Sequence, residues 1–282
     1  MRFSASQLKT WSNCALKAKY HYIDGMQRRS TGTAAHMGSA VHAGLEKHYK
    51  DGGGLDVALS EFDSYYMNPD NYPDTVNRGT TFNGGYEKGV KMLTAYFEDE
   101  ALDQYDRVIL GAEVPFKVDF AGHDLTGFID LLYTNTGYLT LAIQDWKTGR
   151  RPNTDSLYLD VQGTCYAWAV SCKEFWVGHD GDDKYPGIEN GEELYERFKN
   201  VQPDVIWYDL KNNKPYSFGR RTTHDFARLY RLMQMIERAV ETDTYIPTIS
   251  GDSCGFCEYQ DICPVYFDDL NRFDESPVSV VL

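Results

Sequence analysis

The sequence contains no long apolar run. Nowhere in its 282 residues does an apolar stretch approach the ~18–20 residues that a transmembrane helix needs. Residues 1–7 also lack the apolar core of a secretory signal. These two absences predict a cytoplasmic location and no membrane partner.

Positive charge is scarce. Lys and Arg number 28 against 42 Asp and Glu, a net charge of -14. This balance argues against a general nucleic-acid coating protein, which carries a basic surface. It is compatible with a metal site, because such a site needs carboxylates and its cation reverses the local field. Any phosphate contact must then use local cations, for which 147–151 and Arg220–Arg221 are the candidates.

A Gly-rich loop ending in Gly-Lys-Ser or Gly-Lys-Thr is missing as well. That loop holds the phosphates of ATP in P-loop proteins. ATP use within this chain is therefore not predicted.

Cysteine is infrequent but patterned. Without a secretory signal, disulfides are the weaker interpretation of the six cysteines. Cys165 and Cys172 lie in an apolar segment and are predicted to be core residues. Cys254, Cys257 and Cys263 follow a C-x2-C-x5-C spacing, in which the first two thiols can face one metal centre. Because a fourth ligand is missing locally, Cys14 is the candidate, and the spacing alone leaves zinc and iron–sulfur both open.

Hydrophobic periodicity predicts alternating helices and strands. The predicted helices are Ser6–Cys14, Met37–Tyr49, most of 55–106 with a polar break at 68–83, Leu157–Cys172 and Thr223–Thr242. The predicted strands are Val108–Phe120, Leu125–Tyr133 and Tyr138–Trp146 as an antiparallel meander, then Glu174–Val177 and Val205–Leu210. The fold class expected from this order is α/β, with a mixed central sheet flanked by helices.

Two carboxylates and a lysine stand at the ends of the second and third predicted strands. Asp130 and Asp145 can share one sheet edge and hold Mg²⁺ or Mn²⁺ through oxygen ligands. Lys147 leaves the same strand face as Asp145 and can stabilise charge on a phosphate. A lone D-x-K is weak, since an exposed strand end with a salt bridge has the same sequence. Glu113 on the first strand is as readily a solvent-facing residue as an assisting carboxylate.

The motif series resembles that of RecB-like nucleases in the PD-(D/E)XK superfamily. The matching segments are Gly38-Ser39-Ala40-Val41-His42, Gly127-Phe128-Ile129-Asp130, Gln144-Asp145-Trp146-Lys147-Thr148-Gly149 and Gln162-x-x-x-Tyr166. The resemblance implies that the metal is held by His42, Asp130, Asp145 and the main-chain carbonyl of Trp146. It also implies that Lys147 is the catalytic lysine, and that Gln162 and Tyr166 look towards the substrate and the site.

The same resemblance covers the cysteines. Iron–sulfur members of the group, including the AddB nuclease and CRISPR-associated RecB-like exonucleases, are similar in having one Cys before the nuclease core and a cluster after it. This implies a structural 4Fe-4S cluster on Cys14, Cys254, Cys257 and Cys263. It implies one domain over 1–282, with a restriction-endonuclease-like core at about 107–210, a helical insertion at about 50–106 and termini joined at 254–263. No helicase motif accompanies them.

The function expected is a metal-dependent DNA nuclease, an exonuclease on single-stranded DNA or DNA ends. A protein partner from recombination or CRISPR adaptation is part of the same expectation. Two alternatives stay open. One is a non-catalytic DNA-binding or assembly module of the same fold, and the other is a zinc-stabilised protein of unrelated function. Neither the polarity of degradation nor the oligomeric state follows from the sequence.

Overall fold

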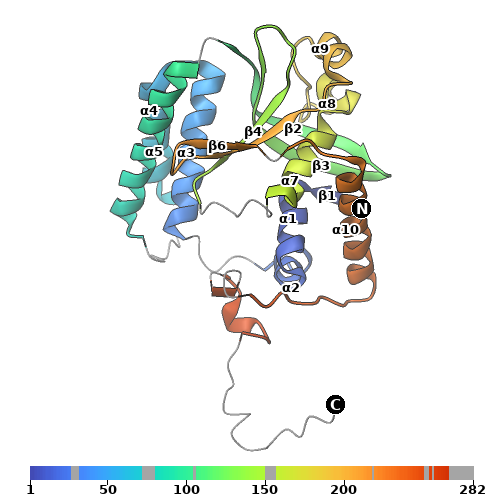
Figure 1. Ribbon diagram of the computed structural model, residues 1–282. Helices are drawn as coiled ribbons and strands as arrows, with labels where there is room; N and C mark the ends of the chain where they lie inside the picture. The colour runs from blue at the N-terminus through green and yellow to red at the C-terminus, as the bar shows by residue number, and fades with distance from the viewer. Residues whose placement is uncertain are drawn as a thin grey trace, which may run out of the picture.

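The computed structural model describes residues 1–26, 32–71, 80–103, 106–149, 157–217, 219–250, 254–255 and 257–266. Its centre is a six-stranded sheet in which β3 is flanked on one side by β2 and on the other by β1 and β4 (Figure 1). The strands are β1 (Arg2–Ser4), β2 (Arg107–Phe120), β3 (His123–Asn135), β4 (Ala142–Lys147), β5 (Asp204–Asp209) and β6 (Lys214–Ser217).

The sheet is mixed. The pairs β2–β3, β3–β4 and β5–β6 are antiparallel, whereas β1–β3 and β4–β5 are parallel. A parallel step needs a crossover, and the segment between β4 and β5 supplies it with helices that include 161–169, 173–177 and 191–198. The α/β class with a mixed central sheet and flanking helices is thus confirmed, as is the β2–β3–β4 meander.

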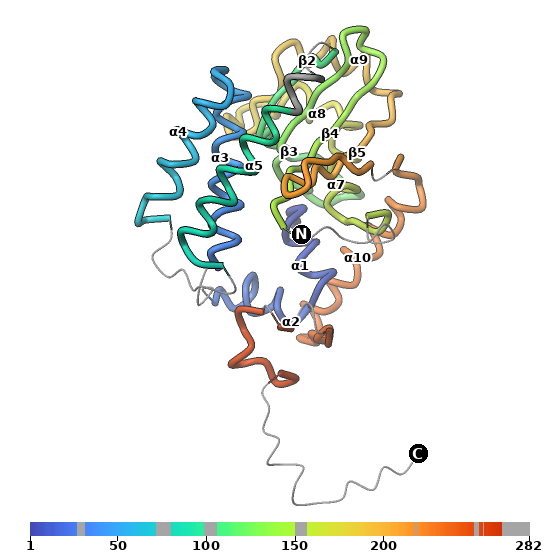
Figure 2. The backbone as a smooth tube through the Cα atoms, turned by 60° about the vertical axis from the view of Figure 1, so that its left-hand side comes forward, coloured from blue at the N-terminus to red at the C-terminus, as the bar shows by residue number. Residues whose placement is uncertain are grey.

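Helices cover both faces of the sheet, and the two views agree on their grouping (Figures 1 and 2). Helices α3, α4 and α5 lie together on one side, and α1, α7 and α10 on the other. The helices are α1 (Ala5–Asn13), α2 (Ala15–Ala18), a π-helical turn (Lys19–Ile23), α3 (Thr33–Asp51), α4 (Gly54–Met67), a 3₁₀ turn (Pro69–Asn71), α5 (Phe82–Asp103), α7 (Val161–Ala169), α8 (Lys173–Val177), α9 (Gly191–Phe198), α10 (Thr223–Glu241) and a second 3₁₀ turn (Gln260–Ile262).

The strands contribute side chains to two hydrophobic cores, because successive side chains alternate between the sheet faces. Trp207 packs in the core under α1, α7 and α10, and its neighbour Tyr208 packs in the core under α3–α5. Ala112 and Val114 break this rule, since they lie two residues apart yet join different cores. The residue between them, Glu113, has a φ of 46°, so the strand changes face at that point.

Several predicted boundaries are wrong. Glu174–Val177 is part of helix α8, not a strand; a short apolar run does not distinguish the two, and Phe175 and Trp176 are both buried. The predicted strand Tyr138–Trp146 begins only at Ala142, and the helix predicted over Leu157–Cys172 is regular from Val161 to Ala169. The polar break at 68–83 contains the turn Pro69–Asn71, and its residues 72–79 lie outside the described part, as do residues 28–31 of the loop predicted at Arg28–Thr33.

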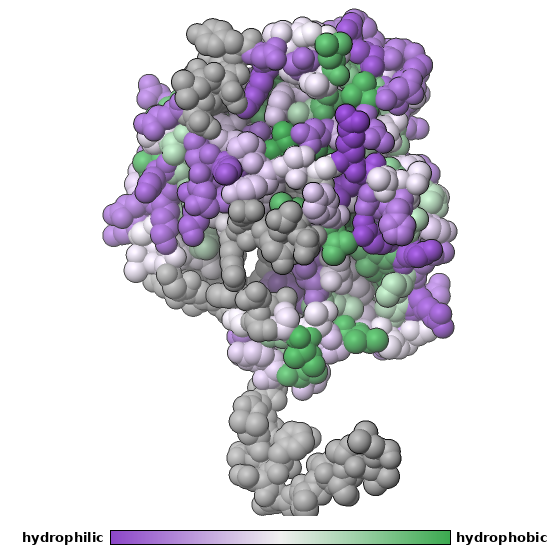
Figure 3. Space-filling model, in the orientation of Figure 1, coloured by the Kyte–Doolittle hydropathy of each residue, from purple (hydrophilic) through white to green (hydrophobic). Residues whose placement is uncertain are grey.

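No helix in the described ranges is long and apolar enough to cross a membrane. The space-filling view shows hydrophilic residues over much of one face, with apolar residues in small separate patches (Figure 3). This surface agrees with the excess of acidic residues in the sequence.

Gly44 allows α3 and α4 to approach closely. A Cβ at this position would lie 2.5 Å from the carbonyl oxygen of Ala58 on α4. Gly44→Ala is expected to destabilise the fold by about 1–3 kcal/mol, because backbone must move to admit the methyl group. The gain in helix propensity, up to ~1 kcal/mol, offsets only part of this.

Urea unfolding followed by circular dichroism measures the Gly44→Ala effect. Ser39→Ala on the exposed side of the same helix is the control, with an expected change within ~0.5 kcal/mol. An unchanged midpoint for Gly44→Ala would contradict the tight packing of α3 on α4.

Candidate active site and cysteine cavity

The two aspartates face each other across the β3–β4 pair. Leu131 pairs with Gln144 in this antiparallel ladder, so Asp130 and Asp145 occupy opposed positions one step further along. Their side chains are buried, with residue exposures of 7% and 3%. The Trp146 amide donates a hydrogen bond of 2.7 Å to Asp130 Oδ2, which fixes that carboxylate against β4.

Helix α3 brings His42 to the same place. Its Nδ1 lies 3.7 Å from Asp130 Oδ2 and 3.8 Å from Glu113 Oε1. Its Nε2 donates to the carbonyl oxygen of Trp146 over 2.9 Å. The Trp146 carbonyl therefore lies beside His42, and here it accepts a hydrogen bond from the histidine.

Gly38 helps to seat His42. A Cβ at Gly38 would meet Thr148 Oγ1 at 2.8 Å, so the helix passes directly against the loop that follows β4. One turn later on the same face, His42 reaches the strand ends. This contact gives a physical reason for the Gly-x-x-x-His spacing.

Glu113 joins the site through an unusual backbone. The β2–β3 register runs from Ala112 opposite Leu131 to Val114 opposite Ile129, and the position between them is unpaired. A left-handed φ at a non-glycine residue costs about 1–3 kcal/mol, and such strain clusters at functional sites. At this bend the Glu113 carboxylate reaches His42.

These residues form a donor set that fits a hard divalent cation. The ligating atoms of His42, Glu113 and Asp130 all lie within 4.8 Å of one another. Nearby, Asp145 Oδ1 is buried and has no hydrogen-bond partner among the described residues. A buried, unpartnered carboxylate oxygen is costly unless a cation satisfies it. Mixed carboxylate and imidazole donors suit Mg²⁺ or Mn²⁺.

Electrostatics agree with this interpretation. Burial raises the pKa of Asp130 and of Asp145 in the metal-free protein. Burial also opposes a charge on His42, but the Asp130 and Glu113 carboxylates outweigh it, so the net pKa of His42 is raised. Each carboxylate thus lacks sufficient positive charge in its surroundings, and a bound cation would supply it.

Glu113→Gln is expected to weaken Mn²⁺ binding by about 10- to 100-fold, since it removes one charged oxygen donor and keeps the side-chain shape. Electron paramagnetic resonance of free Mn²⁺ during a titration measures this directly. Glu87→Gln, at an exposed position of α5, is the matched control and should bind as wild type does. Equal affinity of Glu113→Gln and wild type would remove Glu113 from the donor set.

Lys147 stands beside Asp145. Its Nζ lies 2.5 Å from Asp145 Oδ2 and 3.5 Å from Gln162 Oε1. Burial lowers the pKa of Lys147, but Asp145 and Asp130 outweigh that effect and its net pKa is raised. The ammonium group is therefore held charged where it can face a phosphate.

Helix α7 supplies the polar neighbours of this lysine. The helix begins where Asp160 caps the Gly163 amide. Gln162 Nε2 donates to the Tyr166 hydroxyl over 2.5 Å. Tyr166 is almost fully buried, which raises its pKa well above the usual value, so the phenol remains neutral.

Two features of the site escaped sequence reasoning. Lys9 of α1 donates to Gln162 Oε1 over 3.1 Å and lies 3.7 Å from Asp160 Oδ2; no local motif marks it. Of the candidate phosphate-binding cations, Arg221 is buried and donates to the carbonyl oxygens of residues 157 and 158, which is a structural role. Arg150 and Arg151 lie outside the described residues.

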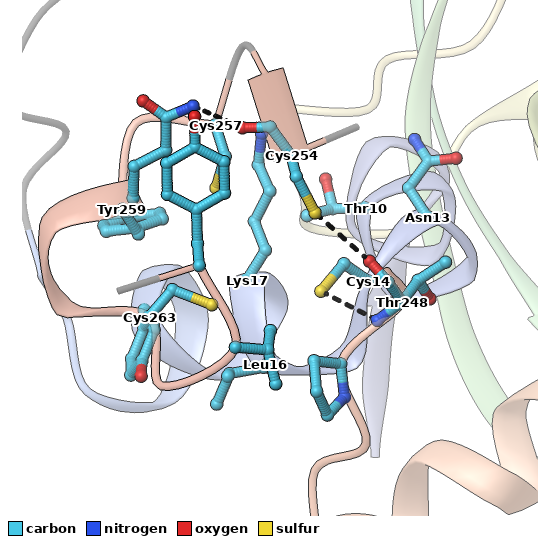
Figure 4. A pocket seen from close by; sticks show the side chains of 15 residues that line it. Thr10, Asn13, Cys14, Leu16, Lys17, Thr248, Cys254, Cys257, Tyr259 and Cys263 are labelled. Carbon is cyan, nitrogen blue, oxygen red and sulfur yellow. Dashed lines mark hydrogen bonds between the residues drawn. The ribbon is translucent and has the colours of Figure 1, made fainter. Parts of the chain in front are cut away.

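The four patterned cysteines line one cavity of about 250 Å³. Cys14 caps the start of α2, and the other three come from the segment after α10. The Sγ atoms of Cys14 and Cys263 point towards each other across this space (Figure 4). The Thr248 amide donates to Cys14 Sγ at 3.5 Å, and burial raises the pKa of the Cys257 thiol.

Cys165 and Cys172 are elsewhere. Cys165 is fully buried in the core under α1, α7 and α10, and Cys172 packs against that core. Burial raises the pKa of Cys172 to about 12. The prediction that Cys165 and Cys172 are core residues is thus confirmed.

Comparison with protein families gives a match over nearly the whole chain. The model of the PD-(D/E)XK nuclease superfamily matches residues 2–264. Gene 69 protein of Mycobacterium phage L5 is 26% identical over 154 residues, which are 55% of this chain and 44% of the phage protein. The matched region thus spans less than half the length of that relative.

Solved structures are more distant. A crystal structure of an exonuclease candidate from Eubacterium rectale aligns with a TM-score of 0.47 and 12% identity, covering 100% of this chain and 91% of the other. The crystal structure of SSO0001 gives a TM-score of 0.35 and 12% identity, covering 93% and 95%.

Proposed function

We propose that this chain, which belongs to the PD-(D/E)XK nuclease superfamily, is a deoxyribonuclease that degrades single-stranded DNA or DNA ends as an exonuclease. The observation that carries the proposal is the convergence of His42, Glu113 and Asp130 beside the ion pair of Asp145 and Lys147. Candidate metal ligands, an unpartnered carboxylate oxygen and a charged lysine thus meet on strands β3 and β4 of the sheet.

The residues have distinct roles in this proposal. His42, Glu113, Asp130 and Asp145 would hold Mn²⁺ or Mg²⁺, with the Trp146 carbonyl beside them. The metal supplies Lewis-acid chemistry, lowering the pKa of water and neutralising phosphate charge. Lys147 stabilises the negative charge that develops on the phosphate oxygens. Gln162 holds Lys147 in place through a 3.5 Å contact, and Tyr166 holds Gln162.

The test is a nuclease assay on end-labelled linear single strands with Mn²⁺, Mg²⁺ or EDTA. We expect metal-dependent degradation that EDTA abolishes, faster with Mn²⁺ because an imidazole ligand favours the softer ion. A circular single strand of the same sequence separates the modes, because an exonuclease leaves it intact. Cleavage of the circular strand would show that the protein is an endonuclease and not an exonuclease. No cleavage with either metal would favour the non-catalytic binding or assembly module.

We also propose that Cys14, Cys254, Cys257 and Cys263 hold a structural 4Fe-4S cluster. Thiolates around one zinc ion, each about 2.3 Å from it, lie only about 3.8 Å apart. Among the described residues, no three of these sulfurs lie within 4.8 Å of one another, and they surround a cavity of about 250 Å³. This spacing favours a multi-iron group, whose thiolates bind different irons, over a single ion.

Free thiolate ligands also favour a reducing compartment, so we propose a cytoplasmic location. A partner protein from recombination or CRISPR adaptation is proposed from the resemblance of the motifs alone.

A further inference from the structure

A groove of about 460 Å³ runs away from the proposed metal site and includes His42, Glu113 and Asp130 in its lining. Its floor is the sheet itself. Thr126, Phe128 and Asp130 follow one another at alternate positions of β3, and all three line the groove. Thr126 and Phe128 therefore share one face of the strand, and Asp130 stands where β3 changes face, because Ile129 and Leu131 join different cores.

Phe128 is exposed where its neighbours are not. Its exposed fraction is 51%, against 7% for Asp130, which lines the same groove. Two strand positions separate them, a distance of about 6.6 Å along β3. In the β2–β3 ladder it stands opposite Pro115, so its cross-strand neighbour on β2 is apolar. Packing gives no reason for a large aromatic side chain here.

Two cations lie further along the same groove. Arg2 of β1 donates to the Tyr185 hydroxyl over 2.8 Å, and the exposed Lys184 precedes that tyrosine. Within the described part of the chain, neither cation is paired with a carboxylate. Lys117, by contrast, lies 3.7 Å from Asp182. Unpaired cations beside an acidic site are well placed for an anionic ligand.

We propose that this groove is a binding track for single-stranded DNA, in which a base stacks on Phe128 while Arg2 and Lys184 contact backbone phosphates. The inference rests on the proposed nuclease function and deepens it. A base in a duplex is already stacked and paired, so only an unpaired base can lie on the ring. A strand held this way leads a phosphate to His42, Glu113 and Asp130.

Binding of a fluorescein-labelled oligo-dT strand, followed by anisotropy with Ca²⁺ in place of Mn²⁺, tests the stacking. Phe128→Leu should weaken binding by about 5- to 150-fold, the equivalent of ~1–3 kcal/mol for one stacked base. Phe128→Trp should retain it. Met235→Ala, a more exposed apolar position on α10 at 69%, should bind as wild type does.

An abasic strand of the same length separates stacking from a structural effect. Wild type and Phe128→Leu should bind this strand equally, since no base is present. The Mn²⁺-induced rise in melting temperature should be the same in both, because the metal ligands are untouched. Equal binding of oligo-dT by wild type and Phe128→Leu, or a loss that persists on the abasic strand, would overturn the stacking role.

The double variant Arg2→Ala/Lys184→Ala tests the phosphate contacts. The slope of log K against log salt should become shallower by about 1.4, since each phosphate contact to a single strand contributes ~0.7. An unchanged slope would show that neither Arg2 nor Lys184 contacts a phosphate. These outcomes are distinct from failure of the proposed function, in which wild type itself cuts no DNA with Mn²⁺ or Mg²⁺.

Discussion

Asp145→Asn is expected to lower the rate of DNA hydrolysis by on the order of 10³-fold or more. The carboxylate is the acidic partner of Lys147, at 2.5 Å, and its Oδ1 is the buried oxygen that a cation would satisfy. Asparagine keeps the shape but carries no charge, so both the metal and the lysine lose their partner. Losing one preorganised electrostatic group costs about 10²–10³ in other enzymes, and here two functions depend on it.

The same substitution should leave the metal-free fold intact. Burial raises the pKa of Asp145, which means that a neutral side chain is easier to accommodate there than a charged one. The substitution also leaves the Lys147 ammonium, 2.5 Å from that carboxylate, without its acidic partner, and a stranded buried charge costs more than the neutral side chain gains. We therefore expect the metal-free variant to fold but to melt below the wild-type temperature. Saturating Mn²⁺ should raise the melting temperature of wild type through binding to the native state, and this rise should disappear in the variant.

Single-turnover kinetics and thermal melting measure the two effects together. Asp204→Asn on neighbouring β5, where the side chain is exposed, is the control and should retain wild-type rates and Mn²⁺ stabilisation. A lost rate with retained Mn²⁺ stabilisation would place the metal on the other donors alone. Wild-type rates from Asp145→Asn would show that the active site lies elsewhere.

The parts of this site that could be predicted from sequence are those that rest on local spacing. Asp145 and Lys147 share a strand face because they are two apart, and His42 follows Gly38 by one helical turn. The long strands β2 and β3 were predictable because 14 and 13 residues give many alternations. At three residues, β1 gives no such pattern, although it carries one wall of the groove.

Other parts depend on contacts between distant segments. Glu113 enters the donor set only because the backbone bends at a φ of 46°, and strand periodicity assigns it an ordinary position. Lys9 meets Gln162 across 153 residues, and nothing near Lys9 in sequence records that contact. Arg221 has a side chain that commonly binds phosphate, yet its guanidinium donates instead to two backbone carbonyls of the segment before α7.

Helix α1 connects the two proposed metal centres. Lys9 lies in the middle of the helix and contacts Gln162. Cys14 lies at the C-terminal end, where the Cys14 amide donates a hydrogen bond to the carbonyl oxygen of Thr10. The helix packs on α7 and shares its core through Leu8 and Trp11. Anything that displaces Cys14 therefore displaces the support of Gln162 and, through it, of Lys147.

Cys14→Ser is for this reason expected to have the second large effect. It should abolish iron and sulfide incorporation and destabilise the fold by at least ~3 kcal/mol, the scale of losing a cross-link that closes a long loop. The proposed cluster would join the start of the chain to the segment after α10, which also contacts that start through Lys17 with Glu258 at 2.8 Å and the Tyr259 hydroxyl with the Met26 carbonyl at 3.1 Å. Nuclease activity should fall with it, because α1 loses its anchor.

Protein purified without oxygen gives the measurement. Wild type and Cys172→Ala, a packing cysteine outside the cavity, should both contain iron and inorganic sulfide in equal amounts and absorb near the blue end of the visible spectrum. Cys14→Ser and Cys254→Ser should contain neither and should unfold at lower urea concentration. Zinc in place of iron in wild type would rule out the iron–sulfur cluster, but the bound metal would still anchor α1 through Cys14. Full iron content in both serine variants would instead show that these thiols are not its ligands, and the sulfur spacing around the cavity would need another explanation.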